Sequence, residues 1–147
     1  MSVNSEAAVL DYTPSATSFL EGAERYLVSA VILCDAGRSV DPIGLVASHG
    51  VELALKAYLL HCGVSEKALR VIGHDLTELW MQARLKGLQI EPCAPYWLRV
   101  LSFAQGRPHH LYRYPPDRIA SAIPEAQELK RELSAFLATV TAAVRRS

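Results

Sequence analysis

Apolar residues recur every three to four positions in several segments of this chain, and Gly and Pro residues separate those segments. The strict alternation of apolar and polar residues that marks a β-strand does not occur. The pattern therefore predicts an all-α fold, an up-and-down bundle of four to five helices with the second and last helices at its centre. The segments expected to be helical are 14–36, 43–62, the short 65–73, 75–86, 95–105 and 124–146.

Residues that favour helix ends support these boundaries. Thr13 is the expected N-cap of the first helix, with Pro14 at its first position. Ser65 is placed to cap the short third helix, and Asp75 followed by Glu78 predicts a capping box for the fourth. A length of 147 residues fits one domain, 1–147, in which 1–12 is expected to be a flexible N-terminal segment.

The second helix carries an unusual polar stripe. Between His49 and Leu60 nearly every residue is apolar except His49, Glu52 and Lys56, and at about 100° per residue these three side chains point the same way. One interpretation is an intrahelical pair of Glu52 and Lys56, with His49 bonded to a loop carbonyl. The other is that the stripe faces His74 or Arg113 across a shallow cleft and binds a phosphate or a nucleotide edge.

Composition narrows the class of protein. Fifteen Lys and Arg residues balance fifteen Asp and Glu residues, so any contact with nucleic acid has to be local. No leader pattern is found, and no run of apolar residues reaches the length of an uncharged membrane span, so we expect a soluble, cytoplasmic protein. Three cysteines, Cys34, Cys62 and Cys93, are expected to be reduced and mostly buried.

Metal and cofactor binding are not expected. The cysteines and histidines lack the short paired spacings of zinc sites, and no Gly-rich phosphate loop follows a strand. We therefore expect that the chain binds no metal ion and no cofactor.

The long irregular stretch from Gly106 to Ile123 is locally basic. With the preceding helix it forms a predicted RNA-binding patch, in which Tyr112 and Tyr114 are available for stacking. A patch of this kind could equally bind an acidic protein partner. Its members are Arg99, Arg107, His109, His110, Arg113 and Arg118.

Three short elements resemble the HEPN domain family. They are the segment from His49 to Leu60, the Gly73-His-Asp-Leu76 turn and the Arg113-Tyr-Pro115 tripeptide. The resemblance implies a bundle of four or five helices that is often dimeric. It also implies a role among RNA-targeting toxins, defence proteins and the partners of nucleotidyltransferases.

The chain departs from that family at its nuclease motif. Catalytic members carry an arginine followed, after four to six intervening residues, by a histidine. Here Arg70 and His74 have only three residues between them, and no histidine follows Arg113. The family's ribonuclease role is therefore not carried over, and His49 and His74 are left as weak catalytic candidates. Whether the chain is an enzyme stays open, with a non-catalytic role favoured.

We predict an RNA- or nucleotide-associated binding or regulatory module, part of a toxin–antitoxin or defence system. A divergent metal-independent ribonuclease and a protein-interaction scaffold are the alternatives. A homodimer is expected because several helices are apolar on more than one side, and a nucleotidyltransferase-type partner follows from the resemblance. The predicted ligand-binding residues are His49, Glu52, Lys56, His74, Asp75, Arg113 and Tyr114.

Overall fold

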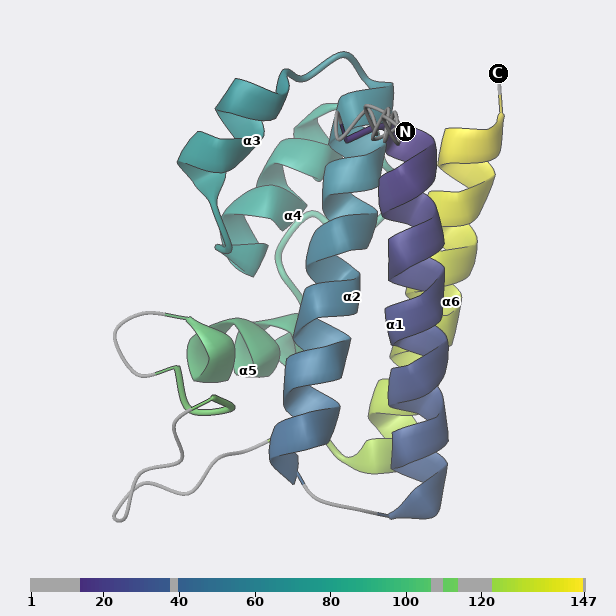
Figure 1. Cartoon of the computed structure of the whole chain (residues 1–147), viewed down its shortest axis with the longest axis vertical. Coiled ribbons are helices and arrows are strands. Elements are labelled where there is room, and N and C mark those ends of the chain that lie inside the picture. The colour runs from purple at the N-terminus through teal and green to yellow at the C-terminus, as the bar shows by residue number, and fades with distance from the viewer. Residues whose placement is uncertain (1–13, 38–39, 107–109, 114–122, 147) are drawn as a thin grey trace, which may run out of the picture.

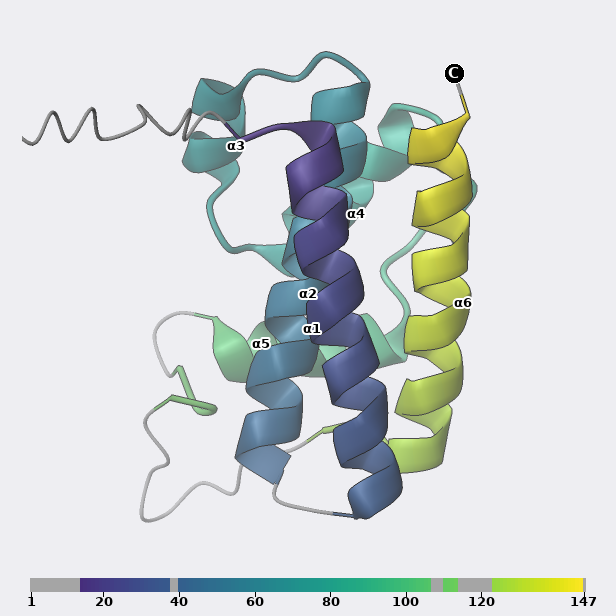
Figure 2. The ribbon, with the colours of Figure 1, turned by 45° about the vertical axis from the view of Figure 1, so that its right-hand side comes forward.

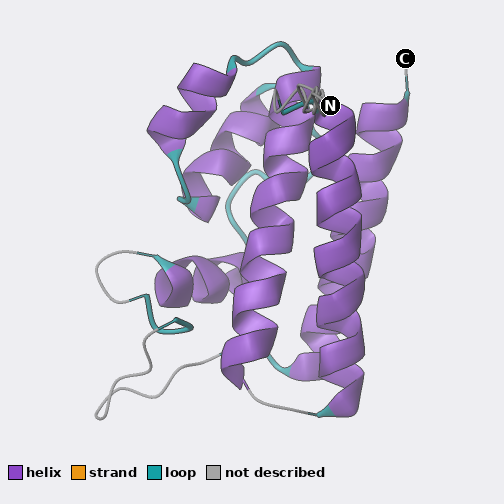
Figure 3. Cartoon of the chain, viewed as in Figure 1, coloured by secondary structure: helices purple, strands orange, loops and turns teal. Residues whose placement is uncertain are grey.

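The computed structural model describes residues 14–37, 40–106, 110–113 and 123–146. In these residues it contains helices and no strands, so the all-α prediction is confirmed (Figure 3). The predicted N-terminal segment 1–12 lies outside the described residues. The helices are α1 Ala16–Ala36, α2 Val40–His61, α3 Glu66–Ile72, α4 Leu76–Leu85, α5 Tyr96–Gln105 and α6 Ala126–Arg145.

Helix α2 is the centre of the fold, as predicted. It contacts α1, α4, α5 and α6, and α1 and α6 run beside it along the long axis of the molecule (Figures 1 and 2). Two parts of the predicted arrangement are wrong. Helix α5 lies across the long helices in both views, so the described part is not a simple up-and-down bundle (Figures 1 and 2). Each of the six predicted helical segments forms a helix, so a bundle of only four to five helices is not confirmed. Helix α6 lies on the outside, with Arg131, Ala135 and Ala138 exposed.

Three aromatic rings join α4, α5 and α6. The ring centroids of Trp80 and Trp97 lie 5.8 Å apart, and Phe136 lies 5.7 Å from Trp80 and 5.9 Å from Trp97. Aromatic rings at this separation bury large apolar areas and add about 0.5 to 1.5 kcal/mol per pair. All three rings are buried.

The two long N-terminal helices begin at different residues from those predicted. Ser15, rather than Thr13, caps α1, because Ser15 and Ser18 each bond the other's backbone N–H in a capping box. Helix α2 begins at Val40 instead of Ile43. Pro42 does not prevent this, because residues in the first helical turn need no backbone N–H partner within the helix.

The caps of α3 and α4 are confirmed. The Ser65 hydroxyl accepts a hydrogen bond from the Ala68 N–H, and the Asp75 carboxylate accepts from the N–H groups at the start of α4. The reciprocal half of the predicted capping box is absent from the described bonds, because the Glu78 carboxylate accepts from Gln82 instead. Asp75 alone therefore satisfies the first amides of α4.

Helix α6 begins two residues later than predicted. Glu125, not Pro124, precedes its first turn, and the Glu125 carboxylate accepts hydrogen bonds from the N–H groups of Gln127 and Glu128. These bonds favour the charged form and lower the pKa of Glu125.

Helix α2 is long and apolar enough to meet a length-and-composition criterion for a membrane span, and 67% of the qualifying window is buried inside the protein. Burial of this extent is typical of the core helix of a soluble protein. The cysteines are all free, but the prediction that they are mostly buried is wrong for Cys93, which is exposed, while Cys34 is buried and Cys62 half-buried.

Candidate functional site

The carboxylate of Glu52 is the centre of a polar cluster on α2. Glu52 is only 4% exposed. Its Oε2 lies 3.1 Å from Nζ of Lys56, and its Oε1 lies 2.8 Å from Nδ1 of His74. The predicted pairing of Glu52 with Lys56 within α2 is therefore confirmed, and Glu52 also meets His74 in the turn that precedes α4.

His74 is held at this carboxylate by the turn between α3 and α4. Gly73 has φ 68°, which favours glycine and sharply redirects the chain at the end of α3. The backbone oxygen of His74 accepts a 2.7 Å hydrogen bond from Nε2 of Gln105, at the end of α5. The imidazole is 80% exposed, so it presents its Nε2 edge to solvent while Nδ1 bonds Glu52.

Asp75 was predicted among the ligand-binding residues, and the structure assigns its carboxylate to the helix cap. One carboxylate oxygen accepts from the N–H groups of Thr77 and Glu78 and from the Thr77 hydroxyl. Since these bonds position α4 directly after His74, Asp75 contributes to the cluster through the backbone.

His49 lies beside the cluster and packs against α1. Its ring meets Tyr26 edge to face, with centroids 4.5 Å apart. The predicted bond to a loop carbonyl is not found among the described contacts. Burial lowers the pKa of the His49 imidazole; the Glu52 charge opposes this, and Arg113, His74 and Lys56 add to the lowering. His49 is therefore held mainly neutral near pH 7.

This pKa shift predicts a specific pH dependence. The folded state keeps the pKa of His49 below its ordinary value of 6.5, so in mild acid the unfolded chain binds more protons there. The contribution of the neutral His49 imidazole to the free energy of unfolding is therefore lost as pH falls below 6.5. We expect the urea midpoint to drop more between about pH 7 and pH 5 in the wild type than in His49→Gln. Equal drops of the urea midpoint in the wild type and in His49→Gln would contradict the lowered pKa of His49.

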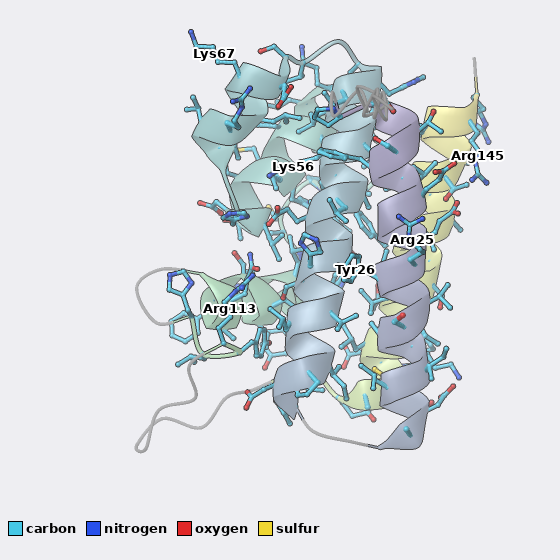
Figure 4. The ribbon with its side chains drawn as sticks, viewed as in Figure 1. Arg25, Tyr26, Lys56, Lys67, Arg113 and Arg145 are labelled. Atoms are coloured by element: carbon cyan, nitrogen blue, oxygen red, sulfur yellow. The ribbon has the colours of Figure 1, made fainter. Side chains whose placement is uncertain are left out.

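Arg113 reaches the same region from a short turn at 110–113. Its charge lowers the pKa of His49, which places it within electrostatic range of that ring. Lys56 and Arg113 both lie on the side of α2 that faces α4 and α5 (Figure 4). The Arg113 side chain is exposed, so it is accessible to a ligand.

The turn that carries Arg113 is anchored by Tyr112. This ring is 4% exposed and packs at Gly44 of α2, where an added Cβ would lie 2.3 Å from two of its carbons. Burial raises the pKa of Tyr112, and Asp41 adds to the rise. The prediction that Tyr112 is available for stacking is therefore wrong. A glycine in an otherwise apolar helix, where a neighbouring group can approach the backbone closely, was the sequence signal for this contact.

A chain of polar contacts joins the late turn to the cluster. Nδ1 of His110 lies 3.1 Å from the backbone oxygen of Gln105, whose own amide bonds His74. His110 has φ 45°, a left-handed conformation that is uncommon outside glycine and is often found at functional sites. The contacts thus run from His110 through Gln105 and His74 to Glu52 and Lys56.

Ser48 adds a buried polar atom one turn before Glu52 on the same side of α2. It is fully buried, and its Oγ has no hydrogen-bond partner within the described part of the chain. Sequence reasoning missed Ser48 because a lone serine in an apolar helix usually bonds the carbonyl of the preceding turn.

Only part of the predicted RNA-binding patch lies within the described residues. Arg99 is exposed on α5, and His110 is half-buried with its ring engaged at Gln105. The remaining members Arg107, His109 and Arg118, together with the predicted ligand residue Tyr114, lie outside the described residues. Among the described residues, no group of three or more His, Cys, Asp and Glu side chains is arranged to hold a metal ion.

The arrangement provides two kinds of chemistry. Lys56 pairs with the buried Glu52 carboxylate, and Arg113 adds an exposed cation within electrostatic range of His49, so this surface offers two cations to an anion. His74 also presents a carboxylate-bound imidazole to solvent, with a ring nitrogen open to a ligand. Comparison with family models, with curated proteins and with solved structures finds no match for this chain.

Proposed function

We propose that this chain is a HEPN-like domain that binds a phosphate group of RNA or of a nucleotide above Glu52. The observation that carries the proposal is the double contact of Glu52, which brings Lys56 of α2 and His74 of a later turn to one buried carboxylate. A buried carboxylate fixes the positions of the side chains that hydrogen bond to it. Their remaining N–H groups are then held ready for an anion.

The charges around Glu52 favour an anionic ligand. Glu52 pairs with Lys56, and Arg113 adds an exposed permanent cation within electrostatic range of His49. Arg113 and the His74 ring are exposed, which leaves their donors open to solvent. A phosphate fits because it accepts several charge-assisted hydrogen bonds at once.

The resemblance supplies the biological setting of the proposal. It supports RNA over other polyanions, a role in a toxin–antitoxin or defence system, a nucleotidyltransferase-type partner and a cytoplasmic location. The absence of the family's arginine–histidine motif supports binding or regulation over cleavage.

The test is binding of a fluorescent single-stranded RNA, measured by anisotropy at several salt concentrations. Arg113→Ala is expected to weaken binding about tenfold, from the loss of one charge-assisted contact, and to reduce the salt slope by about 0.7. Arg146→Ala is the matched control, because Arg146 is also exposed but lies at the far end of α6. A nucleoside triphosphate as competitor separates nucleotide binding from RNA binding.

Two results would overturn the proposal. If neither RNA nor nucleotide binds, the stripe is structural and the interaction scaffold is the better interpretation. If Arg113→Ala and Arg146→Ala weaken RNA binding equally, the contact is a general charge effect and the cluster is not the site.

A second function, metal-independent RNA cleavage, is favoured by one observation. His49 has a lowered pKa and suits a general base, while His74, bonded to Glu52, suits a general acid. Cleavage by the adjacent 2′-hydroxyl would persist in a metal chelator, release a 2′,3′-cyclic phosphate and spare DNA. Loss of such cleavage in both His49→Ala and His74→Ala, with folding retained, would establish the enzyme. Intact RNA under these conditions would exclude it.

A further inference from the structure

Tyr26 of α1 lies next to the polar cluster although it belongs to another helix. Its ring meets the His49 ring edge to face, with centroids 4.5 Å apart. His49 in turn lies within electrostatic range of Arg113 and His74. The imidazole of His49 therefore links the Tyr26 ring to the proposed phosphate site.

The Tyr26 ring is open to a ligand. It is 40% exposed, so water still covers part of a large apolar surface that is usually buried. Two other described tyrosines, Tyr58 and Tyr112, are buried, and Tyr96 lies at the start of α5, at the end away from Gln105. Tyr26 is therefore the described tyrosine that can offer its ring to a ligand of this site.

Arg25, the residue before Tyr26, adds a cation on α1. It is exposed, and its guanidinium forms no ion pair within the described part of the chain, although Glu21 lies one turn before it. In Figure 4, Arg25 lies over α1, Tyr26 lies where α1 and α2 meet, and Arg113 lies beyond α2. The three side chains therefore follow one path across the two helices, with an aromatic ring between two cations.

A single RNA strand presents groups that match this order. Its phosphates alternate with bases, and an unpaired base has an open π face that stacks on aromatic side chains. Proteins bind such strands with a basic surface that follows the backbone and with aromatic rings on which the bases stack. In a duplex the bases stack on one another, so their faces are not available to the protein.

We infer that Tyr26 stacks a base of single-stranded RNA and that Arg25 binds the neighbouring phosphate. The inference rests on the proposed function, because it places the preceding phosphate at Arg113 and His74. A strand bound in this way crosses α2 and continues onto α1. The stacking contact selects single strands over duplexes and accepts any base, since every base has a π face.

The test compares the affinity of the full chain for two fluorescent single strands of equal length and charge, oligoadenylate and an abasic ribose-phosphate chain, by anisotropy. The wild type is expected to bind oligoadenylate about tenfold more tightly, from one stacked base. Tyr26→Leu keeps an apolar side chain against His49 but has no π face, so this preference is expected to disappear. Tyr26→Phe is expected to keep it. Tyr96→Leu is the matched control, because Tyr96 is 64% exposed at the start of α5.

A second variant tests the phosphate contact on α1. Arg25→Ala is expected to reduce the salt slope by about 0.7 for both strands, because a phosphate contact does not depend on the base. Arg146→Ala is the control, and its salt slope is expected to equal that of the wild type. Circular dichroism of each variant shows that it is folded.

The outcomes separate this inference from the proposed function. If Arg113→Ala weakens RNA binding but Tyr26→Leu still prefers oligoadenylate as the wild type does, Tyr26 stacks no base and the phosphate site stands. Equal loss of the preference in Tyr26→Leu and Tyr96→Leu would overturn the inference as well. So would a duplex that binds as tightly as the single strand. If neither strand binds, both the inference and the proposed function are wrong.

Discussion

Replacing Glu52 by alanine is expected to lower the free energy of unfolding by about 3 kcal/mol, since breaking a buried ion pair leaves an uncompensated charge. The Lys56 side chain is only 13% exposed, so water cannot fully replace the lost carboxylate. His74 loses its partner as well, which frees the turn before α4. The measurement is urea unfolding at neutral pH.

Two further variants are needed to interpret the stability loss of Glu52→Ala. Glu52→Gln keeps the shape of the side chain and can still form hydrogen bonds. Its free energy of unfolding is therefore expected to fall less than that of Glu52→Ala. Glu66→Ala is the matched control, because Glu66 pairs with Arg70 at the same helical spacing but in an exposed position. Glu66→Ala is expected to lower the free energy of unfolding by no more than about 0.5 kcal/mol. Equal losses in Glu52→Ala and Glu66→Ala would show that burial of the cluster contributes nothing.

Replacing Gly44 by alanine is expected to displace Tyr112 and, with it, Arg113. The new methyl group would lie within 2.3 to 2.6 Å of three carbons of the Tyr112 ring, well inside van der Waals contact. Alanine gains about 1 kcal/mol of helix propensity over glycine, and overpacking costs about 1 to 3 kcal/mol. We expect the free energy of unfolding of Gly44→Ala to fall by about 1 kcal/mol and its RNA binding to be weaker.

Gly22→Ala is the control for this change. The added methyl group at Gly22 meets only Cδ1 of Leu53, at 3.2 Å, and that atom is the end of a flexible side chain. Gly22→Ala is therefore expected to be neutral or stabilising, with RNA binding unchanged. Stability is measured by urea unfolding and binding by anisotropy. A Gly44→Ala protein that matches Gly22→Ala in both would show that Tyr112 does not position Arg113.

The periodicity of apolar residues was sufficient to predict most of the fold. It indicated all helical segments of the described chain and the central place of α2, because a helix that is apolar on most sides has to be surrounded. Helix ends were less certain: Ser15 replaced Thr13 as a cap because its reciprocal partner, Ser18, lies within reach. The transverse path of α5 could not be predicted, since periodicity says which face is buried and not the direction in which the helix runs.

The candidate site, like the fold, could be predicted only in part from the sequence. Helical geometry aligned His49, Glu52 and Lys56, and the structure brings His74 to Glu52. The role of Tyr112 was mistaken because an aromatic residue in a basic loop resembles a stacking platform until its burial against Gly44 is known. The link from Gln105 to the backbone of His74 was not foreseen either, because contacts distant in sequence leave no periodic signal.

The central claim is that His74, Glu52 and Arg113 form one phosphate-binding site, and imidazole NMR of the histidines during titration with single-stranded RNA tests it most directly. We expect the His74 and His49 signals to shift together and to saturate with the anisotropy curve, and both shifts to vanish in Arg113→Ala. RNA binding that leaves both imidazole signals unmoved would contradict the account.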